Sequence, residues 1–410
     1  MKSLHWIAVL TALACLLSCK SSGPEVKLYA FNQATLEQTR EQIHDGEFAH
    51  MAAYDHLIAQ ADELLDAKIL SVMDKPLVAP SGDKHDYFSM APYWWPNPDT
   101  ADGLPYVRRD GETNAEVRKL DNMIMDKMAN AVCKLALAYY FTNNEAYAVK
   151  AVEQLQTWYI NPETRMNPNM DYAQVVLGHD NNWGRCYGII DKYEFVYVMD
   201  AMRILHCSKS FSDEDYAAIQ QWYSEFVDWL LTSKNGVAEG KTKNNHANSY
   251  DAQVIAFSTF AGREDVARDV VAQFMERRIY KQVQPDGSQP EELARTNGLG
   301  YSNYNIQLVA SVCNLAKALG VDLLNEQTVE GRTIISMVDY ISQYLGVEQS
   351  QFPYKQINGW EKAQQKTYLI THWAHDKFPN RGYEKRLNQL KDYQIPETAL
   401  YWLTKDISMN

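Results

Sequence analysis

Four residues in two polar segments combine the side chains needed to remove a proton next to a carboxylate. Asn245 and His246 are adjacent in the first segment, and Tyr301 follows Arg295 by six residues in the second. Such a hydrogen becomes removable when amide and guanidinium groups neutralise the carboxylate, and a phenol can protonate the leaving oxygen. The set predicts β-elimination from a uronic-acid polymer, with these four residues as the catalytic group.

Each of the four residues also has a purely structural explanation. Asn245 could cap the helix that follows, with His246 as its polar neighbour. Arg295 could form an ion pair with a nearby glutamate, and Tyr301 could belong to the core of the next helix. The catalytic interpretation therefore depends on a fold that brings both segments to one place.

Two aromatic loops are candidates for holding a sugar polymer. Loop 85–98 has too many prolines for a regular helix, and loop 178–188 is rich in glycine and asparagine. Aromatic rings beside amides form stacking platforms for sugars; the alternative is that both loops pack over the core. The predicted substrate-binding residues are Trp94, Trp95, Asn182, Trp183, Arg185, Lys243, Tyr250, Glu291 and Glu292.

No metal or organic cofactor is expected. His372 and His375 have a spacing compatible with metal ligation on a helix, but the sequence offers no third ligand. The four cysteines beyond Cys19 lack the close spacing of zinc sites and are too few for a disulfide framework.

The N-terminal segment 1–18 has the pattern of a lipoprotein signal peptide. A positive end and a short apolar run lead to a lipoprotein-type cleavage site before Cys19. We expect Cys19 to carry the lipid and 19–24 to be a tether, with ordinary signal-peptidase cleavage as the alternative. The protein would then be exported as a periplasmic or outer-membrane lipoprotein, in contact with the membrane only through its lipid.

The formal net charge of -13 argues against nucleic acid as the main partner. An acidic protein that acts on a polyanion must concentrate basic residues in its cleft. Arg185, Lys241, Lys243 and Arg295 lie within or beside the two candidate segments and loops. We expect an acidic polysaccharide as the partner and a monomeric protein.

Helical periodicity dominates the chain after residue 25. Ser212 is predicted to cap a helix whose apolar positions follow three-and-four spacing. The absence of a sequence repeat favours a helical toroid over an α-solenoid. We predict one all-α domain over 25–410, an (α/α) toroid (incomplete barrel) of about six to seven helical hairpins, with short strands at most near Val107 and 281–283. The other expected helices cover 36–45, 48–69, 119–141, 144–159, 191–206, 248–260, 264–280, 302–319, 326–345, 361–375, 382–391 and 396–405.

Three motifs occur in a defined order along the chain. They are Ser-Met-Ala-Pro-Tyr-Trp-Trp-Pro-Asn-Pro at 89–98, Asn-Asn-His at 244–246 with Tyr-Asp-x-Gln at 250–253, and Pro-Asp-Gly at 285–287 followed by Glu-Leu-x-Arg-Thr at 292–296 and Tyr301. Together they resemble the alginate lyase superfamily, and the chain is most similar to the alginate and glucuronan lyases of polysaccharide lyase family 38. The resemblance extends over about residues 50–375.

The resemblance implies an (α/α) toroid with an active-site groove that cleaves 1,4-linked uronans by β-elimination. By motif position, Asn245 would neutralise the substrate carboxylate and Arg295 would bind it. His246 would handle a proton or help with neutralisation, and Tyr301 would be the acid and, for some sugars, also the base. Residues 247–249, Ala-Asn-Ser, depart from the aromatic-bearing sequence of family-5 enzymes, which bears on polymer preference.

The stereochemistry of the sugar decides between two proton-transfer schemes. Mannuronate and glucuronate carry the C5 hydrogen and the C4 oxygen on the same face, so a Tyr301 phenolate could serve both steps. That scheme expects Arg295 or His246 to lower the pKa of Tyr301. Guluronate carries the two groups on opposite faces, so His246 would be the base and Tyr301 the acid.

Two other functions remain compatible with the sequence. A hydrolase on a helical toroid could draw a carboxylate pair from Asp286, Glu291 and Glu292. A non-catalytic glycan-binding lipoprotein could use the tryptophans of the two aromatic loops.

Overall fold

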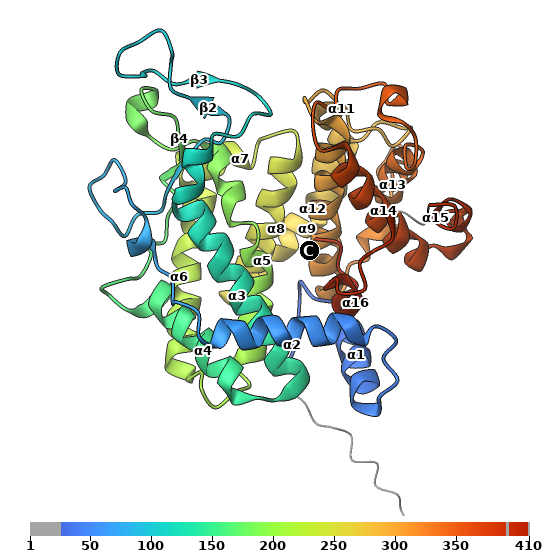
Figure 1. The fold of residues 1–410 in the computed structure, drawn as a ribbon, viewed down its shortest axis with the longest axis horizontal. Helices are drawn as coiled ribbons and strands as arrows, with labels where there is room; N and C mark the ends of the chain where they lie inside the picture. The colour runs from blue at the N-terminus through green and yellow to red at the C-terminus, as the bar shows by residue number, and fades with distance from the viewer. Residues whose placement is uncertain (1–25, 391–392, 409–410) are drawn as a thin grey trace, which may run out of the picture.

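The computed structural model describes residues 26–390 and 393–408, and most of them are helical (Figure 1). Five helices form an inner row in which α3 packs on α5, α5 on α8, α8 on α12 and α12 on α14. Outer helices α4, α9 and α13 pack on α3, α8 and α14 respectively, and α6 packs on α8. Two layers of helices in this order confirm the predicted all-α (α/α) toroid. The helices are α1 (Gln33–Asp45), α2 (Met51–Leu65), α3 (Asp121–Thr142), α4 (Glu145–Leu155), α5 (Phe195–Leu205), α6 (Asp213–Thr232), α7 (Lys234–Glu239), α8 (Asn245–Phe260), α9 (Glu264–Phe274), α10 (Tyr280–Gln282), α11 (Pro290–Leu293), α12 (Gly298–Ala318), α13 (Ile334–Ser342), α14 (Trp360–Lys377), α15 (Glu384–Leu387) and α16 (Tyr401–Thr404).

Helix α6 illustrates how local sequence forms these elements. The Ser212 side chain accepts a hydrogen bond from the Asp215 backbone N–H, as the sequence predicts, and three acidic residues occupy the first turn. One face of α6 is buried and carries Ile219, Trp222 and Phe226. Amphipathic spacing therefore turns this helix toward the core.

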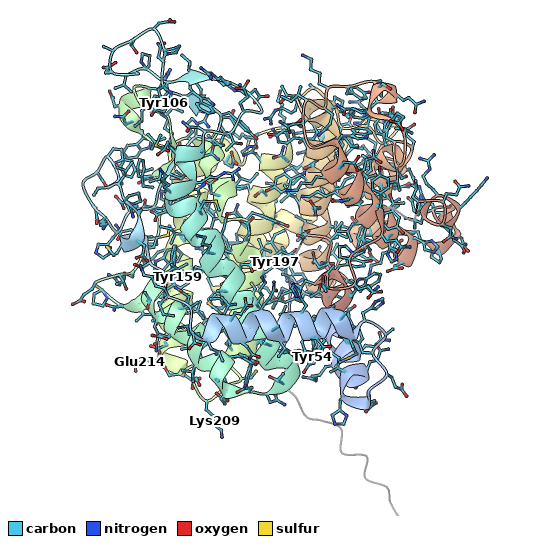
Figure 2. The ribbon with its side chains drawn as sticks, in the orientation of Figure 1. Tyr54, Tyr106, Tyr159, Tyr197, Lys209 and Glu214 are labelled. Carbon is cyan, nitrogen blue, oxygen red and sulfur yellow. The ribbon has the colours of Figure 1, made fainter. Side chains whose placement is uncertain are left out.

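The main hydrophobic cluster draws residues from Leu28 near the start of the described chain to Ile407 near its end. Figure 2 shows Tyr159 and Tyr197 inside the helical body, and Lys209 and Glu214 at its edge. Within residues 26–390 and 393–408, no helix is long and apolar enough to cross a membrane.

Four short strands lie at one end of the toroid, near the top of Figure 1. Strand β1 (Phe88–Met90) pairs in parallel with β4 (Tyr172–Val175). Strand β2 (Trp94–Trp95) pairs antiparallel with β3 (Val107–Arg108), which confirms the strand expected near Val107.

The strand expected at 281–283 is wrong, because this segment continues a helix. Helix α9 runs through a π-helical turn, Met275–Ile279, into α10. The Arg332 guanidinium donates to the carbonyls of Tyr280 and Val283 at the end of α10. A cation that binds the terminal carbonyls stabilises the end of a helix, and strand pairing is then not needed.

Candidate active site

The two catalytic segments meet where the inner helices begin, and we call this end of the toroid the upper mouth. Helix α8 begins at Asn245, and α12 begins at Gly298, so His246 and Tyr301 each lie in a first helical turn. The bridge between Asn297 and Gln356 places the start of α14 nearby. Helix N-termini carry partial positive charge, which favours anionic groups at this mouth.

Asn245 and Glu292 join the two segments directly. The Asn245 backbone N–H donates to Glu292 Oε1 at 2.6 Å, and the Asn245 side-chain amide donates to Glu292 Oε2 at 2.7 Å. Burial raises the pKa of Glu292 to about 7, although the hydrogen bonds from Asn245 oppose the rise. The N-cap residue Asn244 makes no side-chain capping bond, so the Glu292 carboxylate does this work from another helix.

His246 is oriented by a buried carboxylate that the sequence analysis missed. Its Nδ1 lies 2.6 Å from Oε1 of Glu239, whose side chain is fully buried, and its ring packs edge-on against Tyr187. A carboxylate at Nδ1 favours the tautomer with a proton on that nitrogen and leaves Nε2 able to accept one. Glu239 is the last residue of α7, which follows α6 after a tight turn. Glycine is required at position 236 in this turn, because a Cβ there would lie 2.0 Å from the Leu230 carbonyl oxygen.

Tyr301 lies in a compact group of polar side chains. Arg295 Nη2 donates to the Tyr301 hydroxyl at 2.8 Å, and the guanidinium lies 3.9 Å from the Tyr301 ring centroid. The Tyr93 hydroxyl lies 2.9 Å from the Tyr301 hydroxyl, and Asp110 accepts from Arg295 at 3.2 Å. Arg295 Nε is buried and makes no hydrogen bond among the described residues.

The pKa of Tyr301 moves opposite to the expectation from the sequence. Burial raises it, the neighbouring Tyr93 raises it further, and Arg295 only partly opposes the rise. The resting Tyr301 is therefore a phenol, which can donate a proton at once but must lose one before it can act as a base.

Glu292 connects the histidine electrostatically with the arginine. Both His246 and Arg295 lower the pKa of Glu292, and His246 also lowers the pKa of the buried Asp191. The structure thus brings all four predicted catalytic residues to the upper mouth, with Glu292 between the two halves.

The aromatic loops lie beside this mouth. Trp94 contacts His179 edge-on at 5.1 Å, and Arg185 stacks over Trp94 at 5.8 Å. The Trp95 indole N–H donates to the Glu112 carbonyl, and Arg109 lies 5.3 Å from the Trp95 ring. These contacts fix both tryptophans while leaving each half-buried.

The second loop presents its tryptophan to solvent. Trp183 is 41 % exposed and packs against Tyr172 at 5.0 Å. Asn182 supports the loop because its side chain accepts a hydrogen bond from the Gly178 N–H. Arg185 donates to the backbone and side chain of Gln174, which holds it next to β4.

The remaining predicted binding residues are placed less uniformly. Lys243 and Glu291 are exposed near the mouth. Tyr250 is buried and donates its hydroxyl proton to the Leu230 carbonyl, so its position is that of a core residue on α8. His372 contacts the Tyr401 hydroxyl far along α14, and Cys19 lies outside the described residues.

Sequence reasoning missed Tyr93, Asp110 and Glu239. Tyr93 lies inside the aromatic motif, where the adjacent tryptophans drew attention away from it. Asp110 and Glu239 carry no local motif, because each reaches its partner only through the fold. An acidic residue seven positions before a candidate histidine was the one available signal for Glu239.

A helical toroid whose mouth combines a carboxylate-oriented histidine with an arginine-bound tyrosine defines a polysaccharide lyase. The model of the alginate lyase family matches residues 71–352. The chain belongs to the alginate lyase family. This membership leaves the hydrolase and the non-catalytic binding protein without support. The hydrolase also needs a pair of carboxylates facing one site, whereas Glu292 is buried and Glu291 is exposed.

Solved structures support the same assignment. A Bacteroides ovatus alginate lyase has a TM-score of 0.88 and 38% identity, covering 92% of this chain and 99% of that chain. Alginate lyase A1-III from Sphingomonas species A1 has a TM-score of 0.51 and 12% identity, covering 82% and 90%, which supports the fold alone. A variant of that enzyme in complex with a tetrasaccharide has a TM-score of 0.52 at 12% identity, covering 87% and 95%. A comparison with curated proteins found no match.

Proposed function

We propose that this lyase cleaves 1,4-linked uronans, alginate or the related glucuronan, by β-elimination. The carrying observation is the Arg295 guanidinium, which is partly exposed and whose Nη2 holds the Tyr301 hydroxyl. A guanidinium is well suited to grip a carboxylate, and the reacting oxygen would then lie beside the phenol. The likeness to alginate lyases supports the substrate class.

The elimination transfers one proton from C5 to the base and one proton from the acid to the leaving oxygen. The base takes the C5 hydrogen, the C–H electrons form the C4–C5 double bond, and the C4–O bond breaks with a proton delivered to the leaving oxygen. Arg295 and Asn245 neutralise the carboxylate so that charge can spread onto it. Glu292, with a pKa raised to about 7, adds little opposing charge while it is protonated.

The resting phenol form of Tyr301 favours Tyr301 as the acid, which leaves His246 as the base. Glu239 holds His246 Nδ1, which directs Nε2 to the proton that is removed. This arrangement suits guluronate, whose reacting groups lie on opposite faces of the ring. For mannuronate or glucuronate, Tyr301 first gives up its proton and then serves both steps.

The test measures the ultraviolet absorbance of unsaturated uronate ends after mixing enzyme with mannuronan, guluronan, mixed alginate and glucuronan. We expect absorbance to rise with at least one polymer. Tyr301→Phe should reduce kcat by on the order of a hundredfold or more while binding persists, because the hydroxyl carries the proton transfer. No product from any of these polymers would refute the proposal.

We also propose that the protein is exported as a periplasmic or outer-membrane lipoprotein and acts as a monomer. The cleavage-site pattern before Cys19 supports lipidation. Cys19→Ala should abolish incorporation of a labelled fatty acid and move the protein from the membrane to the soluble fraction. Light scattering of the mature chain without its lipid should give the mass of one copy.

A further inference from the structure

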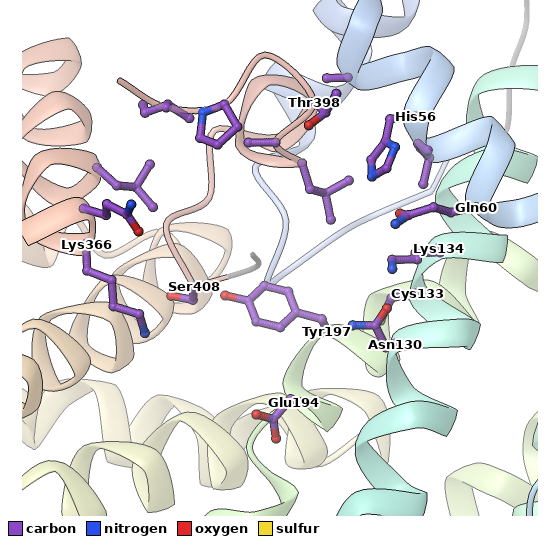
Figure 3. A pocket seen from close by; sticks show the side chains of 18 of the residues that line it. His56, Gln60, Asn130, Cys133, Lys134, Glu194, Tyr197, Lys366, Thr398 and Ser408 are labelled. Atoms are coloured by element: carbon purple, nitrogen blue, oxygen red, sulfur yellow. The ribbon is translucent and has the colours of Figure 1, made fainter. Parts of the chain in front are cut away.

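Two joined cavities lie away from the catalytic residues. The larger, of about 740 Å³, lies among α2, α3, α5 and α14, and Figure 3 shows the side chains that surround it. The smaller, of about 570 Å³, lies between α2 and α3. Both are lined by Gln60, Asp126, Asn130 and Lys134, so they form one continuous depression, which we call the second groove.

The second groove lies inside the toroid and below the active site. Tyr301 and Gln307 both lie on α12, six residues apart, with Tyr304 between them. At 1.5 Å per residue, Gln307 is about 9 Å further along the helix than Tyr301. Lys366, which lines the larger cavity, donates to Gln307 Oε1 at 3.2 Å. The groove is thus separate from the catalytic group yet within the span of an oligosaccharide.

The charge of the second groove is opposite to that of the whole protein. The chain has 52 acidic and 39 basic residues, but six lysines and only three carboxylates line the two cavities. Among the described residues, no carboxylate lies within ion-pair distance of Lys127, Lys134, Lys362 or Lys366. Ammonium groups gathered without counter-charges favour an anionic ligand. The lysines are Lys68, Lys127, Lys134, Lys150, Lys362 and Lys366; the carboxylates are Glu63, Asp126 and Glu194.

The uncharged lining suits a sugar. Gln60, Asn130 and Gln365 line the larger cavity, and their amides make no hydrogen bond within the described chain. Figure 3 shows Tyr197 in the wall of the same cavity, where its ring is buried and its hydroxyl donates to Asp406. Amides pair with hydroxyl groups, and lysines attract carboxylates. These features together select a sugar acid over a simple anion.

We infer that the second groove binds a uronic-acid oligosaccharide at a site separate from the catalytic one. The identity of the ligand rests on the proposed function, whereas the site itself rests on the lysines, the amides and the cavity. Such a site would hold a second segment of polymer, or a product, next to the catalytic mouth.

The experiment counts binding sites by isothermal titration calorimetry in the full-length Tyr301→Phe protein, which does not consume its ligand. The probes are alginate and glucuronan hexasaccharides, with a neutral β-1,4-glucan hexasaccharide as the uncharged control. We expect two sites per chain for one acidic probe and none in the groove for the neutral probe. Adding Lys134→Gln and Lys366→Gln should remove one site, whereas the exposed-lysine changes Lys209→Gln and Lys385→Gln should leave both.

A gentler variant guards against loss of folding in the double variant. Lys127 is exposed at the rim, so Lys127→Glu should keep the fold and weaken the second site at least severalfold. In the active enzyme, the two groove variants should leave cleavage of a short oligosaccharide unchanged. If calorimetry finds a single binding site and none of these lysine changes affects it, the second groove does not bind the oligosaccharide, while the lyase function stands. If Tyr301→Phe binds none of the acidic probes and the active enzyme forms no unsaturated product, the proposed function is refuted as well.

Discussion

At the scale of single residues, the tyrosine is the group whose protonation limits the chemistry. Its pKa is raised by burial and by Tyr93, so Tyr301 rests as an acid. A same-face elimination needs the phenolate, whereas an opposite-face elimination needs the phenol. One side chain therefore responds to pH in opposite ways for two sugars.

The first prediction follows from that opposition. Below the raised pKa of Tyr301, the phenolate fraction grows about tenfold per pH unit, so the ratio of kcat/KM on mannuronan to that on guluronan should rise with pH. Initial rates on both polymers from about pH 7 to about pH 9, at constant ionic strength, measure this ratio. Rates that recover on return to neutral pH serve as the control. A ratio independent of pH would remove the phenolate from the mechanism.

Glu239 is the second residue whose role can be tested. Glu239→Gln keeps an oxygen for His246 Nδ1 but removes the negative charge that stabilises a protonated imidazole, so kcat should fall by on the order of tenfold or more. The pH profile of kcat should shift as well, which a purely structural role would not cause. Glu225→Gln changes an exposed glutamate on α6 and should leave both quantities unchanged. Equal profiles for wild type and Glu239→Gln would contradict a positioning role.

At the scale of elements, long amphipathic helices were predictable and the parts that complete the site were not. The helix capped by Ser212 follows from its spacing and its first-turn acids, and the observed α6 agrees. Tyr93 and Glu239 reach the site through pairing of β2 with β3 and through the tight turn before α7, which are tertiary events. The segment 281–283 illustrates the same limit, since a distant arginine decides how it ends. Local periodicity contains no information about such partners.

Close packing between the segment Cys186–Lys192 and β4 positions Arg185 and Asp191 near the mouth. A Cβ at Gly188 would lie 2.4 Å from the Ala173 Cβ. Gly188→Ala should therefore destabilise the protein by about 1–3 kcal/mol through overpacking and should also lower activity. Gly46→Ala is the comparison, because Gly46 has φ of 74° in open space far from the site. The Gly46→Ala substitution destabilises the folded state only because alanine disfavours a positive φ. Chemical denaturation should therefore detect a loss of stability without a loss of kcat.

At the scale of the whole molecule, the inside of the toroid contains buried carboxyl groups, Asp126, Asp191 and Glu194, that repel one another when ionised. Burial raises the pKa of Asp126 to about 7, and repulsion from Asp191 adds to the rise. Burial likewise raises the pKa of Glu194 to about 8, with Asp126 contributing. The folded protein therefore holds protons that the unfolded chain releases at lower pH.

The sign of the resulting pH dependence is fixed by linkage. The pKa of Asp126 is raised from 3.8 to about 7 on folding, so its contribution to stability is lost as pH rises through that interval. Asp126→Asn carries no titrating group, and it should be more stable than wild type by up to about 4 kcal/mol at about pH 8. At about pH 4 both proteins are uncharged at this position, and the difference should nearly vanish.

Urea unfolding at the two pH values measures this difference, with Asp99→Asn as the matched control. Asp99 is exposed, so its removal should change stability little and equally at both values. Removing the charge at Asp126 also removes its repulsion of Glu194. The gain in stability at high pH is therefore a property of the carboxyl cluster and not of one side chain. A gain that is equal at both pH values would assign the effect to packing and would contradict the buried charge. A gain in stability confined to high pH would show that repulsion and burial of ionised carboxylates inside the toroid destabilise the folded protein.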